Sequence, residues 1–300
     1  MGDWILAIEG TAEGHRLALA LALLAAFLHA VFGALQKGRH DPWLTRGAID
    51  VSYGMMALPF VLFVVPWPEP HMWPIFLGVF VIHTVYKLLQ AMAYTRGAYT
   101  VVYPVVRGTS PLFAVIGAGL LFGETFTPIQ WLGVAILLCG IFGLAVYNIV
   151  FLQVDRDTLL PALGLAVATG LFVALYTTFD AFGIRATADP FTFLAWFFLI
   201  DAFAMPALAV RRWRDLAQTP PVAGLALRGV IGAVVALFSF GSIMMATRLD
   251  TVGEAAVLRE TSTLFAAVIG WVFLKETVGP RRLALMALIA LGAVVVEAGG

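Results

Sequence analysis

The chain consists largely of apolar runs that are about as long as a membrane is thick. A helix needs roughly 20 apolar residues to cross a hydrocarbon core of about 30 Å. Ten such spans are placed at 16–36, 49–66, 73–95, 98–121, 128–148, 159–182, 190–209, 222–246, 252–274 and 280–298. Open strands are excluded because their backbone groups stay unpaired in lipid. The sequence therefore predicts an all-α integral membrane protein with about ten transmembrane helices.

Composition supports this class and excludes several others. Of 300 residues, 61% are hydrophobic and only 12% are charged, too few to coat a soluble protein. The net charge of zero gives no basic face for nucleic acid. The single cysteine, Cys139, forms no internal disulfide, and no Cys/His spacing predicts a metal or cofactor. Residues 1–15 form a polar tail whose acidic residues do not fit a signal peptide.

The most informative feature is an internal repeat. Residues 107–125 are RGTSPLFAVIGAGLLFGET, and residues 259–277 are RETSTLFAAVIGWVFLKET. At an offset of 152 residues, Arg107 matches Arg259 and Glu124 matches Glu276. So many identities at one offset indicate two copies of one structural unit.

Each unit holds five of the predicted helices. The units are 16–148 and 159–298, joined by a linker loop at 149–158. Because five is odd, the second unit enters the membrane from the opposite side to the first. The result is an inverted repeat, an arrangement that secondary transporters use to alternate access to a central site.

Basic residues indicate the orientation. Of the 18 Lys and Arg residues, Lys87, Arg107 and Arg259 lie well inside spans, and Arg16, Arg185 and Arg248 are assigned to the side of the N-terminus. The other twelve lie opposite: Lys37, Arg39, Arg46, Arg96, Arg156, Arg211, Arg212, Arg214, Arg228, Lys275, Arg281 and Arg282. The positive-inside rule then predicts that both termini lie outside the cytoplasm.

Several motifs resemble a known family. The stretch YTRGAYTVVYPVVRGTSPLF at 94–113 is similar to the signature of the third and fourth helices of EamA-domain proteins, in the drug/metabolite transporter superfamily. The runs FGET at 122–125, LKET at 274–277 and YTTFDAFGIR at 176–185 also resemble that family. The resemblance implies ten helices, two EamA repeats, a central substrate cavity and a place in the bacterial inner membrane. It also implies export of amino acids or other metabolites.

Six charged residues inside the predicted spans are candidate site residues, because an unpaired charge in lipid is costly. They are Lys87, Arg107, Asp180, Asp201, Arg259 and Glu260. Three are positive and three are negative, so they either line a wet cavity or pair with one another. Both interpretations remain open.

The third span carries one polar stripe. His83, either Tyr86 or Lys87, Gln90 and Tyr94 recur at three- and four-residue steps on an otherwise apolar helix. We expect this stripe to face a cavity. The equivalent face of the eighth span is milder, so the polar end of a solute is expected nearer the first half.

Arg107 stands between two prolines, Pro104 and Pro111. The prolines break the helical hydrogen-bond ladder, and such a break is tolerated where it lines a cavity. A guanidinium there can bind a carboxylate or phosphate through two hydrogen bonds. Alternatively, Arg107 and Arg259 clamp the helices of their own halves.

The remaining candidates in the spans are Tyr176, Asp180 and Glu260. Tyr176 and Asp180 lie one turn apart and either hold a substrate amine or form a packing pair. Glu260 is expected to pair with another helix, through Lys87 or Arg107.

Further roles follow for smaller groups. The candidates for proton coupling are Glu260, Asp180 and His29. Tyr103 and Trp196 are placed in an aromatic cavity wall. Glu124 and Glu276 are each expected to cap the turn into the next helix.

The favoured function is secondary-active export of a small zwitterionic or anionic, amino-acid-like metabolite by alternating access. No nucleotide-binding P-loop is present, so protons or the solute gradient are expected to supply the energy. The partners are the solute, the bilayer and protons, and the protein is a monomer or homodimer. The alternatives are efflux of lipophilic cations and flipping of lipid headgroups. An enzyme is disfavoured because the five histidines are scattered and form no catalytic set.

Overall fold

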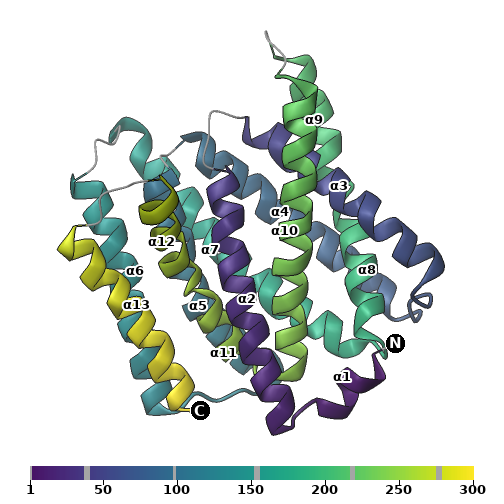
Figure 1. The fold of residues 1–300 in the computed structure, drawn as a ribbon, viewed down its shortest axis with the longest axis horizontal. Helices are drawn as coiled ribbons and strands as arrows, with labels where there is room; N and C mark the ends of the chain where they lie inside the picture. The colour runs from purple at the N-terminus through teal and green to yellow at the C-terminus, as the bar shows by residue number, and fades with distance from the viewer. Residues whose placement is uncertain (1, 37–40, 97–98, 152–155, 217–219, 275–278) are drawn as a thin grey trace.

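The computed structural model describes the whole chain except residues 1, 37–40, 97–98, 152–155, 217–219 and 275–278. The described residues form a bundle of helices without strands (Figure 1). The helices are α1 (Asp3–Ile8), α2 (Ala12–Gln36), α3 (Pro42–Phe63), α4 (Met72–Arg96), α5 (Tyr99–Phe122), α6 (Pro128–Phe151), α7 (Arg156–Ala186), α8 (Pro190–Asp201), α9 (Ala204–Arg214), α10 (Val222–Leu249), α11 (Val252–Arg259), α12 (Ser262–Leu274) and α13 (Pro280–Ala298).

Seven helical stretches are long and apolar enough to cross a membrane, with α8 and α9 taken together. Three predicted spans fall short for separate reasons. Helix α3 carries Arg46 and Asp50, the ninth span is divided into α11 and α12, and the apolar part of α13 is short. The class of multi-pass helical membrane protein is confirmed, and the count of ten spans stays a prediction.

The two halves of the chain interlock in a regular way. The first helix of the first half, α2, packs against α10, α11 and α12 of the second half. The first helix of the second half, α7, packs in the same way against α4 and α5 of the first half. The last helices, α6 and α13, lie side by side (Figure 1). Contacts between the halves, rather than within them, therefore build the centre of the bundle.

Helices α2 and α7 run in opposite directions. His15, near the start of α2, contacts Asp250 at the end of α10. Arg185, in the last turn of α7, donates a hydrogen bond to the carbonyl of the same Asp250. Both chain ends lie at this edge of the bundle (Figure 1), which we call the termini face. The start of one half's first helix thus meets the end of the other's.

Helix α3 begins at Pro42, seven residues before the predicted start at 49. The side chain of Asp41 accepts hydrogen bonds from the N–H groups of Trp43 and Leu44, and Pro42 supplies a preset first turn. Arg46 therefore lies inside a helix and is buried, although the orientation count places it in a loop. The positive-inside count therefore has one basic loop residue fewer than predicted.

Two of the predicted spans are interrupted. The seventh is split into α8 and α9 at Ala202 and Phe203. Pro206 contributes because its ring clashes with the carbonyl four residues earlier. The ninth is split into α11 and α12 at Glu260 and Thr261, where there is no proline.

The expected break near Arg107 is absent, because α5 is continuous from Tyr99 to Phe122 through Pro104 and Pro111. In the repeat, the break lies instead beside Arg259. Its open end is held from the first half, where Arg107 donates a hydrogen bond to the carbonyl of Arg259 across 3.4 Å. The interruption in the second copy is thus contacted by a side chain of the first half.

Candidate functional site

The first buried polar group, the lysine cluster, consists of Arg46, Asp50, Tyr53, Lys87 and Asp201. The ammonium of Lys87 lies 2.5 Å from a carboxylate oxygen of Asp50 and 2.8 Å from one of Asp201. It also donates to the hydroxyl of Tyr53, at 2.9 Å. Arg46 lies 2.9 Å from the second oxygen of Asp50. Two cations thus meet two carboxylates in the interior.

The interruption between α8 and α9 belongs to this cluster. It leaves the main-chain carbonyl of Asp201 free to accept a hydrogen bond from Lys87, at 3.0 Å. The carboxylate of the same residue accepts one from Tyr53, at 2.7 Å. The side chain of Lys87 is only 1% exposed, so protein groups surround it on every side. These contacts favour a structural role for Lys87.

The second group, the arginine cluster, is built on Arg107, Arg259 and Glu260, with hydroxyl partners from three helices. Nε of Arg107 lies 3.0 Å from a carboxylate oxygen of Glu260. The guanidinium also donates to the hydroxyl of Ser262, at 2.8 Å. Glu260 therefore pairs with Arg107, one of its two expected partners, across the two halves.

Arg259 has a different environment. Its guanidinium donates to the hydroxyl of Thr177, at 3.0 Å, and lies 5.8 Å from the ring centre of Tyr176. Its side chain is 3% exposed. Within the described part of the chain, Arg259 has no carboxylate partner, and its Nε has no hydrogen-bond acceptor. The arginine cluster thus carries one more cation than anion.

A layer of rings and one carboxylate lies next to Arg259. His83 of α4 is hydrogen bonded to Asp180 of α7, with Nε2 2.9 Å from the nearer oxygen. The ring of His83 lies 4.7 Å from that of Tyr176, which lies 4.8 Å from that of Tyr86. Four predicted site residues from two halves are therefore brought together.

Space at this layer is small. A cavity of about 10 Å³ lies between α7, α10 and α11, lined by Tyr176, Thr177, Asp180, Phe240, Ile243, Met244, Thr247 and Arg259. That volume holds about one water molecule. In this conformation the guanidinium of Arg259 and the carboxylate of Asp180 line the same cavity, which is too small for a solute.

The other predicted residues surround this centre at greater distance. Gln90 donates to the hydroxyl of Tyr86, at 2.8 Å. Tyr103 lies beneath the guanidinium of Arg107, 6.0 Å from ring centre to carbon. His29 is half-buried, with its ring 6.3 Å from that of Phe240. None of these lines the small cavity.

Trp196 lies in a separate aromatic group. Its ring packs against those of Trp67 and Trp73, at 5.0 and 5.2 Å between centres. The structure thus joins Trp196 to residues near span ends rather than to Tyr103.

Glu124 is a cap, but of a helix in the other half. Its two carboxylate oxygens accept hydrogen bonds from the N–H groups of Val252 and Gly253, at 2.8 and 2.9 Å. Gly123, with a positive φ of 69°, makes the turn that aims Glu124 there. The expected target, the next helix of its own half, is therefore wrong. Glu276 lies outside the described residues.

The residues that sequence reasoning missed are Arg46, Asp50 and Tyr53 of α3 and Thr177 of α7. The Asp-Pro pair at 41–42, a strong helix start, was the available signal for the first two. It extends the second span far enough to include the Arg46 and Asp50 pair. Thr177 carries no such signal.

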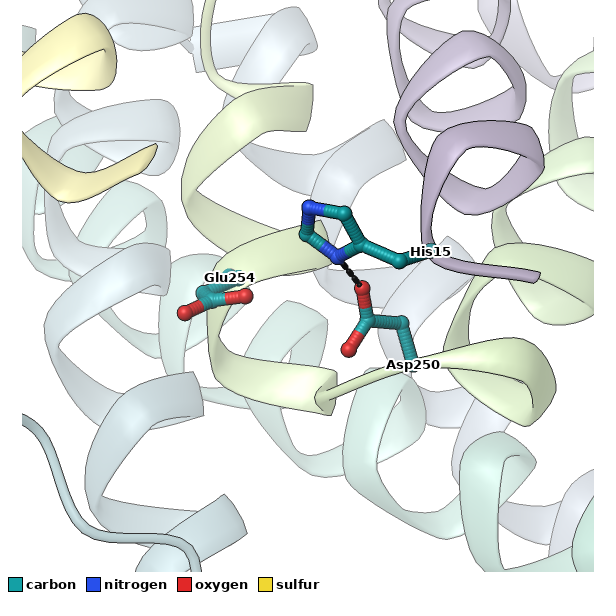
Figure 2. A group of neighbouring side chains, drawn as sticks. All are labelled: His15, Asp250 and Glu254. Carbon is teal, nitrogen blue, oxygen red and sulfur yellow. Dashed lines mark hydrogen bonds and ion pairs between the residues drawn. The ribbon is translucent and has the colours of Figure 1, made fainter. Parts of the chain in front are cut away.

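His15, Asp250 and Glu254 form a group at the termini face that could hold a metal ion (Figure 2). One ligand atom from each lies within 4.8 Å of the others. Each already has a protein partner, because His15 contacts Asp250, and Gln130 donates to Glu254. These contacts explain the arrangement as a link between α2 and the second half.

Comparisons with known proteins agree with this architecture. The model of the EamA-like transporter family matches residues 16–146 and 160–297. The uncharacterized protein y4nH of Sinorhizobium fredii (strain NBRC 101917 / NGR234) is 36% identical over 72 residues, which are 24% of this chain. The match spans 62% of that relative's length.

A solved structure described only as a crystal structure of a protein is similar over nearly the whole fold. It covers 95% of this chain and 97% of its own, with a TM-score of 0.76 and 18% sequence identity. At that identity the likeness concerns the fold alone.

Proposed function

Because this chain belongs to the EamA-like transporter family of the drug/metabolite transporter superfamily, we propose that it carries a small zwitterionic or anionic, amino-acid-like metabolite across the bacterial inner membrane. Transport is secondary-active and runs in the direction of export. The chain forms ten spans in two inverted five-helix units, and both termini lie outside the cytoplasm.

The observation that carries this proposal is the excess positive charge at Arg259. A buried cation without a carboxylate partner is costly in a membrane interior and is typical of a functional site. An anionic group on the solute supplies the missing partner, with Arg259 as its anchor. Asp180, across the same small cavity, faces the amino group of a zwitterion.

The small volume of the cavity is consistent with an occluded conformation. At the termini face the two halves are held together, because Glu124 of the first half accepts hydrogen bonds from the N–H groups of Val252 and Gly253 of the second half, at 2.8 and 2.9 Å. Rocking of the inverted halves breaks this face while closing the opposite one, and widens the central void. The opposed directions of α2 and α7 support this mechanism.

Proton coupling is assigned to Glu260. Its carboxylate is buried between Arg107 and the hydroxyl of Ser110, at 3.1 Å from the latter. When the solute's anionic group arrives at the arginine pair, it competes with Glu260 for the same cations. Protonation of Glu260 then frees Arg107 to bind the anionic group of the solute together with Arg259.

The experiment is a flux measurement in liposomes with purified full-length protein. The panel contains neutral, acidic and aromatic amino acids and short organic acids, each with and without an imposed proton gradient. We expect flux of at least one of these solutes, lost in Arg259→Met and kept in the matched variant Arg96→Gln, an exposed arginine. Absence of flux for the whole panel overturns the proposal.

One observation favours a second candidate, a flippase for lipid headgroups. An apolar cleft of about 570 Å³ lies between α1, α2, α3, α8 and α10, where Phe60 and Phe238 are 55% and 62% exposed. A fluorescent-lipid translocation assay in the same liposomes separates the two functions. Efflux of lipophilic cations, the other alternative, conflicts with the excess cation at Arg259, and a cationic-dye arm of the panel tests it.

A further inference from the structure

A second apolar groove lies at the opposite end of the bundle from the termini. It has a volume of about 320 Å³ and is formed by α3, α9 and the start of α10. Its lining is Leu44, Gly47, Ala48, Val51, Pro206, Ala209, Val210, Trp213, Arg214 and Leu225. In Figure 1, α9 and the start of α10 extend beyond most of the other helices at this end. We place the membrane surface at this end of the bundle, because α9 ends in three arginines.

The groove opens sideways toward lipid. Val51 and Val210 line it and are 46% and 54% exposed. At its floor α3 and α9 touch, since a Cβ on Gly47 would collide with that of Ala209. An elongated apolar chain can lie in this groove and remove its exposed side chains from contact with mobile lipid.

The end of α9 supplies positive charge at one end of the groove. Its sequence, AMPALAVRRWR, is apolar for two turns and then basic. Arg211 and Arg214 are exposed and three residues apart, so they share one face of the helix. Arg214 lines the groove itself.

These two arginines are available to a ligand. Arg212 is already paired with Asp41, at 2.8 Å. Among the residues that the structure describes, no carboxylate pairs with Arg211 or Arg214. Trp213 also lines the groove, and tryptophan favours the depth of the headgroups.

We propose that this groove is a binding site for one anionic phospholipid, with an acyl chain along α3 and α9 and the phosphate at Arg211 and Arg214. A lipid fits both parts of the site at once, because its acyl chain fills the apolar groove and its phosphate pairs with the two arginines. Free phosphate leaves the groove empty, and a zwitterionic lipid leaves the positive charge uncompensated. Basic pockets beside membrane helices recognise anionic headgroups for these reasons.

The test uses the purified full-length protein and native mass spectrometry, with phosphatidylglycerol and phosphatidylcholine of identical chains as probes. We expect phosphatidylglycerol to bind more tightly to the wild type, and R211Q/R214Q to weaken that binding roughly thirtyfold. Arg96→Gln, which removes an exposed arginine at the same end of the bundle, keeps it. Val51→Trp, which fills the groove, weakens binding of both lipids.

Three outcomes overturn the proposal. One is equal retention of phosphatidylglycerol by the wild type and R211Q/R214Q. Another is competition by glycerol phosphate at the same concentration, which indicates an anion site without a chain. The third is a dimer in which Val51→Trp breaks the association, which assigns the groove to a second copy of the chain. The test requires no transport activity and is independent of the proposed function.

Discussion

The lysine cluster and the arginine cluster are both buried, both lie at a helix interruption, and both join the two halves, yet their charges differ. In the lysine cluster, Arg46 and Lys87 meet Asp50 and Asp201, so the charges balance. In the arginine cluster, Glu260 pairs with Arg107, and among the described residues Arg259 has a hydroxyl and an aromatic ring as partners but no carboxylate. A balanced interior network needs no guest, whereas an unbalanced one gains from an anion. We therefore assign stability to the first and solute binding to the second.

The largest expected effect is at the lysine cluster. Lys87→Met leaves Asp201 and Asp50 with one cation between them, and removal of one partner from a buried ion pair costs about 3–5 kcal/mol. We expect little folded protein by fluorescence-detected size exclusion. In K87M/D201N the charges balance again, and most of the folded protein should return. A Lys87→Met variant that folds normally but no longer binds solute would reverse the assignment of the two clusters.

A smaller loss of stability, with a larger loss of function, is expected at Arg259. Arg259→Met removes no ion pair, so the melting temperature should change little. Charge-assisted hydrogen bonds contribute about 1.5–3 kcal/mol each, so solute affinity should fall about ten- to a hundredfold. Ligand-induced thermal stabilisation and liposome flux measure this change. Unchanged affinity would remove the basis for placing the solute at the arginine cluster.

Glu260→Gln tests proton coupling at the arginine cluster. Glutamine can still accept hydrogen bonds from Arg107 and Ser110 but carries no charge, so we expect a loss of stability smaller than the about 3–5 kcal/mol for a buried ion-pair partner that is not replaced. Flux is measured on the folded fraction. Because the variant has no carboxylate to protonate, an imposed proton gradient should no longer accelerate flux, while exchange of solute for solute continues. The measurement is flux with and without the gradient, and full gradient-driven flux in the variant would exclude Glu260 as the coupling group.

The smallest effect is expected at Glu69, a carboxylate outside the spans that contrasts with the buried ones. Partial burial acts to raise the pKa of its carboxyl, but hydrogen bonds from the N–H of Ala188 and the hydroxyl of Thr187 outweigh burial and hold that pKa below its ordinary value. The stability it contributes is complete above the unfolded pKa of Glu, and is lost as pH falls through the lower folded value.

Glu69→Gln should therefore change stability near pH 7 within about 0.5 kcal/mol. Thermal melting between pH 3 and pH 6, about the range that brackets the Glu pKa, measures the effect. The wild type should lose its small advantage over the variant toward the acid end. An advantage that grows on acidification contradicts the assigned direction.

The sequence identified several residues of the site but not their partners. His83, Tyr86, Arg107 and Glu260 were identified because a polar residue in an apolar run is conspicuous. Which polar residue pairs with which was not predictable, because the partners come from helices far apart in the chain. Arg259 and Arg107 occupy equivalent repeat positions, yet within the part of the chain that the structure describes Arg107 pairs with a carboxylate and Arg259 does not.

The helix interruptions were also only partly predictable from the sequence. Prolines in α5 indicated a break near Arg107, yet that helix is continuous, while α11 ends at Arg259 without a proline. Likewise, Glu124 was identified as a cap, but its target lies in the other half. Local sequence therefore identified the residues that can open or cap a helix but not where they act.

By itself, the sequence determined that this chain is a membrane-embedded helical protein with two related halves, because hydropathy and repeat identity are local properties. Only the tertiary structure decided which charges balance and which guanidinium is left without an anion. The reason is physical: the cost of a buried charge depends on groups brought within a few ångströms by packing between the halves, and that packing is not written in any one segment.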